Sequence, residues 1–201
     1  MPFNGSRPGA MSTKYPICPG RNLIETSKVM SIAVGSDTDA WSAPVYYLFS
    51  EGLFYFFSNP KARHIQMAKN RTSAASIFRD DIDFKNLEGI QMSGTIQKSP
   101  KNIRSLAVAK RYCSRFKITA LPQDISDISD ISDRSDRSDR SDRSDRSDRS
   151  DNPDRSDRSG ISDILDFFAS KFHATLYYFE PECVYYMDNR KGFGSREIIE
   201  L

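Results

Sequence analysis

The feature that most constrains the fold is a low-complexity tract that divides the chain in two. Residues 124–159 repeat a three-residue unit, first Ile-Ser-Asp and then Arg-Ser-Asp, and contain 12 Asp, 8 Arg and only 3 Ile. A segment of this composition cannot build a hydrophobic core. The core must therefore come from both flanks, and we expect the tract to be a disordered or marginally helical excursion on the surface.

Outside the tract, the composition is that of one globular domain. The 201 residues carry a formal net charge of +2, and the tract contributes −4 (8 Arg against 12 Asp), so the remainder stands at +6. We expect a flexible tail over residues 1–13 and a single domain over residues 14–201 that the tract interrupts. A modest positive charge suits a small anionic ligand but does not indicate nucleic acid, and an acidic tract is the wrong sign for a phosphate-binding tail.

Several functional classes are disfavoured by what the sequence lacks. Its three cysteines never form a Cys-x-x-Cys pair, which indicates neither a disulfide framework nor a zinc site, so a reducing, cytoplasmic location is the default expectation. No apolar run approaches the ~20 residues that span a bilayer, so we expect no membrane partner. With two histidines and no HExxH, GxSxG or P-loop sequence, metal and triad chemistry are not indicated.

Period-two alternation of apolar residues predicts a mostly antiparallel sheet with helices at its margins. The clearest case is the sequence IQMSGTIQK over Ile90–Lys98. The expected strands cover Val29–Gly35, Trp41–Phe49, Leu53–Phe57, Ser73–Arg79, Ile90–Lys98, Ala174–Glu180, Cys183–Asp188 and Glu197–Leu201. The expected helices cover Asn22–Lys28, Pro60–Asn70, Pro100–Phe116 and Ile161–Phe172.

The stretch Leu53–Asn70 carries the most functional information. Its aromatic start suits a strand buried on both faces, and Ser-Asn-Pro then supplies a helix cap followed by a first-turn proline. Basic residues follow where the backbone N–H groups of a helix lack partners, which makes a candidate phosphate cradle. A capped surface helix with solvated basic residues is the alternative, and the spacing alone favours it. The candidate cradle residues are Ser58, Lys61, Arg63 and His64.

Five separated segments together resemble the flavin-binding split barrels related to pyridoxamine 5'-phosphate oxidase, and most closely the YhbP-like branch. They occur in the family's order and span nearly all of residues 22–201 outside the tract. The segments are Ala43–Phe49, Phe57–Met67, Gly89–Ile96, Ala109–Phe116 and Tyr186–Gly194. The resemblance implies a six-stranded Greek-key split β-barrel, mainly β with peripheral helices, that forms a homodimer with FMN in a cleft between the subunits.

The resemblance also implies roles for individual residues. Ser58 and Arg63 match residues that bind the FMN phosphate, and His64 stands where the oxidase has lysine, so its charge depends on pH. Gln91 matches a glutamine that contacts the flavin, and Ser42–Tyr47 match the strand whose backbone lies along the isoalloxazine ring. The expected cofactor-binding residues are Ser42, Ala43, Val45, Tyr46, Tyr47, Ser58, Lys61, Arg63, His64, Gln91, Asn189 and Phe193.

Two departures from the oxidase argue against synthesis of pyridoxal phosphate. Its Tyr-x-x-x-Arg pair is replaced by Tyr112 and Arg115, which are one residue closer, and its C-terminal Arg-x-His has no counterpart. We therefore expect a flavin-dependent oxidoreductase of unknown substrate that exchanges electrons with a nicotinamide or another small molecule. The alternatives are a non-catalytic flavin-binding or flavin-sensing module and a split barrel that has lost the cofactor.

Overall fold

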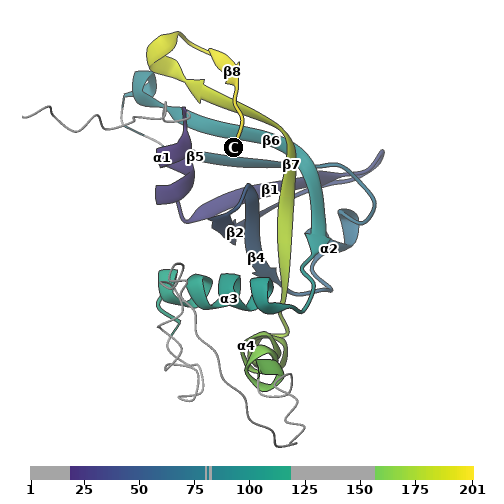
Figure 1. Cartoon of the computed structure of the whole chain (residues 1–201). Coiled ribbons are helices and arrows are strands. Elements are labelled where there is room, and N and C mark those ends of the chain that lie inside the picture. The colour runs from purple at the N-terminus through teal and green to yellow at the C-terminus, as the bar shows by residue number, and fades with distance from the viewer. Residues whose placement is uncertain (1–18, 80, 82, 119–156) are drawn as a thin grey trace, which may run out of the picture.

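The computed structural model describes residues 19–79, 81, 83–118 and 157–201, without the side chains of residues 157–163. Its strands form one antiparallel sheet that curls into a half-barrel, with helices at the margins (Figure 1). The predicted tail 1–13 and the tract up to residue 156 lie outside the described residues, so the expectations for them stay predictions. None of the helices in these described ranges is long and apolar enough to cross a membrane.

The elements follow one another with short connections, apart from the long segment between α3 and α4. The helices are α1 (Arg21–Thr26), α2 (Arg63–Met67), α3 (Ile103–Arg115) and α4 (Asp157–Phe172), with short 3-10 turns η1 (Phe84–Asn86) and η3 (Asn189–Lys191). The strands are β1 (Val29–Gly35), β2 (Ala40–Tyr46), β3 (Leu48–Ser50), β4 (Leu53–Ser58), β5 (Ser73–Arg79), β6 (Glu88–Lys98), β7 (Thr175–Asp188) and β8 (Arg196–Ile198).

The strand order is β2-β1-β5-β6-β7-β4-β3, with β8 added on β7. The two ends of this order are consecutive in the chain, because only Tyr47 separates β2 from β3. The predicted single strand Trp41–Phe49 is therefore wrong at that residue, where the chain leaves β1 and joins β4. Counted as one strand, β2 and β3 make six barrel strands beside the short β8, which agrees with the predicted fold class.

Period-two alternation fills the inside of the half-barrel. In β1, Met30, Ile32 and Val34 are buried while their neighbours face outward, and Ile77 of β5 and Ile90 of β6 continue the same interior layer. Burying each such side chain stabilises the fold by about 1.5 to 3 kcal/mol relative to leaving it exposed. One face of the sheet is thus committed to the core, which leaves the other face open to further packing.

Strand β4 is buried on both faces, as its aromatic sequence predicts. Phe54 and Phe56 point into the barrel core, whereas Tyr55 belongs to a second cluster formed with α3, α4 and the start of β7. Phe57 packs on that same side and stacks on Phe168 of α4, with ring centroids 3.8 Å apart. The two helices therefore cover the sheet next to the end of β4, where the candidate cradle begins.

Helices α2, α3 and α4 begin at residues other than those predicted, and polar side chains account for the first two differences. The Asn59 Oδ1 accepts the Lys61 N–H at 2.8 Å, so the Asn-Pro pair forms a turn and α2 spans only Arg63–Met67. Helix α3 begins at Ile103 because Asn102, whose side chain accepts from the Ser105 N–H, is its cap. Helix α4 begins at Asp157, so the last three tract residues are helical.

The two strands predicted on either side of Pro181 are one continuous strand, β7. Its pairing with β6 shifts between Ser93 and Gly94, where Gly94 pairs with Pro181 and Ser93 with Cys183, so that Glu182 is the extra residue of a β-bulge. The bulge accommodates the proline, which cannot donate a ladder hydrogen bond. The long strand can thus take part in both the barrel and the sheet that carries β8.

Candidate functional site

The turn between β4 and α2 brings Ser58 and His64 together. Ser58 follows Phe54 and Phe56 on the inward face of β4, and its Oγ lies 2.9 Å from the Nε2 of His64. Both side chains are nearly buried. Burial lowers the pKa of His64 below its usual value of 6.5, because the charged imidazolium is poorly solvated there. At neutral pH this histidine is therefore a neutral hydrogen-bonding group.

Arg63 lies on the solvent side of the same turn. Its NH2 group donates to both carboxylate oxygens of Asp39, at 2.7 and 2.5 Å, and its guanidinium carbon lies 4.5 Å from the centre of the Trp41 ring. The pKa of Asp39 is lowered by this guanidinium. Both partners are about half exposed, so solvent screens the pair and it contributes little to stability. The Nε and NH1 groups of Arg63 have no hydrogen-bond partner among the described residues.

The start of α2 adds backbone donors to this side chain. Helix α2 has Ala62 at its N-cap position, and no side chain caps it. The N–H groups of Arg63 and His64 therefore lack an intrahelical acceptor. Lys61, which precedes the helix, is exposed beside them. A guanidinium, an ammonium and two backbone N–H groups without an intrahelical acceptor thus belong to one turn, and donors of these kinds bind phosphate.

Strand β2 runs away from this turn along an edge of the sheet. It pairs only with β1 among the described strands, so the backbone groups on its other side are not used in the sheet. Ser42 and Tyr46 are exposed, Ala43 is half-buried and Val45 is buried. Tyr47 is fully buried and donates its hydroxyl to the Ile24 carbonyl oxygen at 2.6 Å, and burial raises its pKa. The Tyr47 side chain therefore belongs to the core.

The remaining predicted residues lie elsewhere in the chain. Gln91 is on the outer face of the sheet, in register with Ser76 of β5 and Tyr185 of β7. Asn189 donates to the Phe84 carbonyl oxygen at 2.9 Å, and Phe193, which is 88% exposed, lies in the connection to β8. That connection is at the top of Figure 1, away from α2. A single chain therefore assembles the candidate phosphate cradle but not the whole predicted site.

Two features of the site were missed by the sequence analysis. Asp39 and Trp41 hold the Arg63 side chain, but they belong to the β1–β2 turn, which is brought to α2 only by the tertiary fold. The second feature is the outer face of the sheet, and alternation could have revealed it because its members are out of phase with the core. Its exposed apolar residues are Val29, Tyr46, Phe78, Tyr185 and Ile198.

The burial of His64 gives the fold a pH dependence. As the pH falls below about 6.5, the unfolded chain binds a proton that the folded chain excludes, so the free energy of unfolding decreases toward lower pH. His64→Gln is expected to reduce the drop in melting temperature between pH 7.5 and 5.5. His173→Gln is the matched control, since it also removes one histidine but from an exposed position. An equal drop in wild type and His64→Gln contradicts this assignment.

No protein-family model and no curated protein matches the chain, whereas solved structures do. One is ChuZ from Campylobacter jejuni, with a TM-score of 0.53 and 8% identity over 89% of this chain and 56% of that chain. Another is the heme storage protein HutZ from Vibrio cholerae, with a TM-score of 0.50 and 9% identity over 89% of this chain and 90% of HutZ. A weaker likeness, with a TM-score of 0.47 and 13% identity, is to a FAD-binding protein from Mesorhizobium loti, over 81% of this chain and 87% of that one.

The fold thus defines a class: this chain is a split β-barrel, as its sequence predicts. HutZ, one of the structures that share this fold, is a heme storage protein. At identities this low, the shared property is the fold, and the ligand must be argued from the residues of this chain.

Proposed function

We propose that this chain binds FMN and acts as a flavin-dependent oxidoreductase. The observation that carries the proposal is the position of Arg63, whose half-exposed side chain has no partner for its Nε and NH1 groups among the described residues and lies beside the uncapped start of α2. A phosphate dianion is stabilised by a guanidinium together with free backbone N–H groups. The resemblance to barrels related to pyridoxamine 5'-phosphate oxidase assigns the FMN phosphate to the same arginine.

The edge strand β2 is the proposed support for the flavin ring. Trp41, the second residue of β2, contacts Arg63. A molecule whose phosphate binds Arg63 can therefore extend along β2. The unpaired backbone groups of β2 and the exposed Ser42 and Tyr46 side chains then orient the ring. Bound FMN supplies hydride exchange at its N5 atom, while the protein provides orientation and electrostatics.

A second copy of this chain is the proposed partner, docked on the outer face of the sheet. One row of paired residues crosses this face: Pro44, Ser31, Ser76, Gln91, Tyr185 and Ile198. Small side chains such as Ser31 and Ser76 leave the centre of the face flat, whereas large apolar side chains, including Phe78 at 61% exposed, surround it. An exposed apolar face of this kind is typical of an interface.

The proposed dimer accounts for the separation of the predicted site residues. Arg63 and the Asn189–Phe193 connection lie apart in one chain, so they can contact the same ligand only if they come from different subunits. A twofold axis through the outer face presents the same residues from both copies, as a closed symmetric dimer requires. FMN is then proposed to lie in a cleft that both subunits form, with Gln91 close to the interface.

Phe78→Glu is expected to convert the dimer into a monomer, because each subunit then places one unpaired negative charge in the desolvated interface. Light scattering at micromolar concentration with FMN bound measures the mass. Ile103→Glu is the matched control, since Ile103 is 68% exposed on α3, on another side of the molecule. A wild-type monomer, or dimers of both variants, contradicts docking through this face.

Catalysis is tested separately from binding. Protein loaded with FMN is expected to lose its yellow colour under anaerobic conditions when NADH or NADPH is added, and to regain it on exposure to air. Flavin that binds but is not reduced by either nucleotide favours the alternative, a non-catalytic flavin-binding or flavin-sensing module. If the protein binds no flavin at all, both the oxidoreductase and the flavin-binding module are contradicted.

A further inference from the structure

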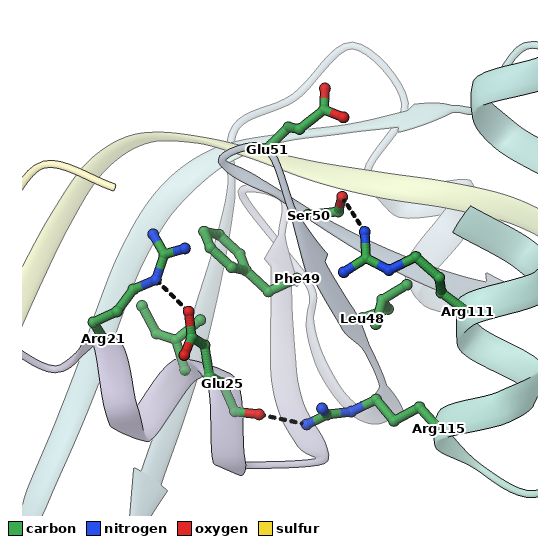
Figure 2. A pocket seen from close by; sticks show the side chains of 9 residues that line it. Arg21, Glu25, Leu48, Phe49, Ser50, Glu51, Arg111 and Arg115 are labelled. Atoms are coloured by element: carbon green, nitrogen blue, oxygen red, sulfur yellow. Dashed lines mark hydrogen bonds and ion pairs between the residues drawn. The ribbon is translucent and has the colours of Figure 1, made fainter. Parts of the chain in front are cut away.

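A polar cavity lies where α1, β3 and α3 meet. It has a volume of about 390 Å³, and Figure 2 shows the side chains of α1, β3 and α3 that line it, whereas Glu51 points away from them. The residues that matter here are Arg21 and Glu25 of α1, Phe49 and Ser50 of β3, and Arg111 and Arg115 of α3. No part of the FMN proposal uses these six side chains.

The side chains that line this cavity carry more positive than negative charge. Glu25 accepts from the Arg21 Nε at 2.6 Å, and Glu51, which also lines the cavity, forms an ion pair with Arg104. Each carboxylate is thus neutralised by its own arginine. Arg111 and Arg115 have no carboxylate partner among the described residues, although they lie one helical turn apart, where like charges destabilise a helix.

Both arginines are held by neutral oxygens that leave donors free. Arg111 donates to the Ser50 Oγ at 3.0 Å. Arg115 donates its NH2 group to the carbonyl oxygens of Glu25 and Ser27, at 2.8 and 2.7 Å, where it caps the end of α1. Its Nε atom is buried and has no hydrogen-bond partner among the described residues. A buried donor of this kind is costly unless a ligand satisfies it.

An apolar surface adjoins these donors. The Phe49 ring lies between α1 and α3 in Figure 2, and the Arg21 guanidinium lies 4.9 Å from its centre. Ile24 and Leu48 complete the apolar part of the lining. We infer that this cavity is a binding site for a phosphomonoester, with the phosphate dianion on Arg111 and Arg115 and the organic group against Phe49.

This site is separate from the proposed FMN cradle. Arg63 contacts Asp39 and Trp41 at the turn of the β1–β2 hairpin, whereas Arg115 contacts Ser27, which precedes β1 at the open end of that hairpin. The seven-residue strand β1 separates the two, which corresponds to roughly 20 Å at about 3.3 Å per residue. A ligand in the cavity can therefore bind whether or not the chain binds FMN.

The test is calorimetric titration of the full chain, free of flavin, with phenyl phosphate and with inorganic phosphate. We expect one phenyl phosphate per chain, bound more tightly than inorganic phosphate because of the contact with Phe49. Arg111→Gln is expected to weaken this binding at least about tenfold, since a hydrogen bond to a charged group is lost. Lys110→Gln is the matched control, because Lys110 precedes Arg111 on α3 without lining the cavity.

Three outcomes overturn the inference. The first is no saturable binding of either compound. The second is an equal loss in Arg111→Gln and Lys110→Gln, which indicates a diffuse effect of charge. The third is binding that persists in Arg111→Gln and is lost in Arg63→Gln, which assigns the phosphate to the FMN cradle. Loss in Arg111→Gln with retention in Arg63→Gln supports the inference even if the chain binds no flavin.

Discussion

Arg63→Gln is expected to weaken the binding of FMN by about 10- to 100-fold, because a charge-assisted hydrogen bond to a phosphate contributes roughly 1.5 to 3 kcal/mol. The glutamine removes the guanidinium, and with it both the positive charge and the contact with the Trp41 ring. Quenching of flavin fluorescence in an equilibrium titration measures the affinity. The melting temperature should change little, since Arg63 is half exposed and its ion pair is weak.

Asp39→Asn provides the matched control at the same ion pair. The Asp39 carboxylate accepts hydrogen bonds from the NH2 group of Arg63 and places a negative charge beside the proposed phosphate site. Its removal is expected to leave FMN binding intact or to strengthen it several-fold, the more so at low ionic strength. FMN affinity that is unchanged in Arg63→Gln, or that falls equally in both variants, contradicts the cradle.

Gly94→Ala is expected to destabilise the fold by more than about 3 kcal/mol, since an added methyl group meets backbone that side-chain movement cannot relieve. A Cβ atom at this position would lie 2.0 Å from the carbonyl oxygen of Glu180, at the bulge that lets β7 pass Pro181. For a domain of this size, the melting temperature should fall by roughly 6 to 12 °C.

Gly35→Ala is the control for the loss of a glycine from a strand of the same sheet. Its Cβ atom would lie 3.7 Å from the Asp39 carbonyl oxygen, which is an ordinary contact, so we expect a change below about 1 kcal/mol. Thermal melting followed by circular dichroism measures both variants. Similar small changes in the two would mean that the bulge shifts easily, and that its register does not depend on Gly94.

Local patterns in the sequence predict the interior of the fold well. The alternation of Ile90–Lys98 and the aromatic run of β4 both describe how side chains meet a sheet, and neither depends on distant residues. The predicted strand boundaries are wrong where tertiary contacts determine the path of the backbone. The hydrogen bond from the Tyr47 N–H to the Lys28 carbonyl oxygen is the last between this segment and the β1 side, after which the chain pairs with β4, and β7 continues through Pro181 because β6 supplies a glycine opposite it.

The candidate site likewise has one part that the sequence predicts and one part that depends on the tertiary fold. Ser58, Arg63 and His64 lie within one turn of chain, so their proximity follows from sequence alone. The contact of Arg63 with Asp39 spans 24 positions, and no local signal marks which of the acidic residues in the β1–β2 turn will approach it. The separation of Phe193 from Arg63 depends on how the whole sheet is arranged, and the alignment of short motifs carries no information about that arrangement.

The most direct test of the phosphate cradle is the ratio of FMN and riboflavin affinities in the wild-type chain, because the two ligands differ only in the phosphate. If Arg63 and the start of α2 bind that group, FMN should bind about 100-fold more tightly than riboflavin, with a difference that shrinks as salt is added. Equal affinities, or saturable binding of hemin by a chain that binds neither flavin, would contradict the proposed function.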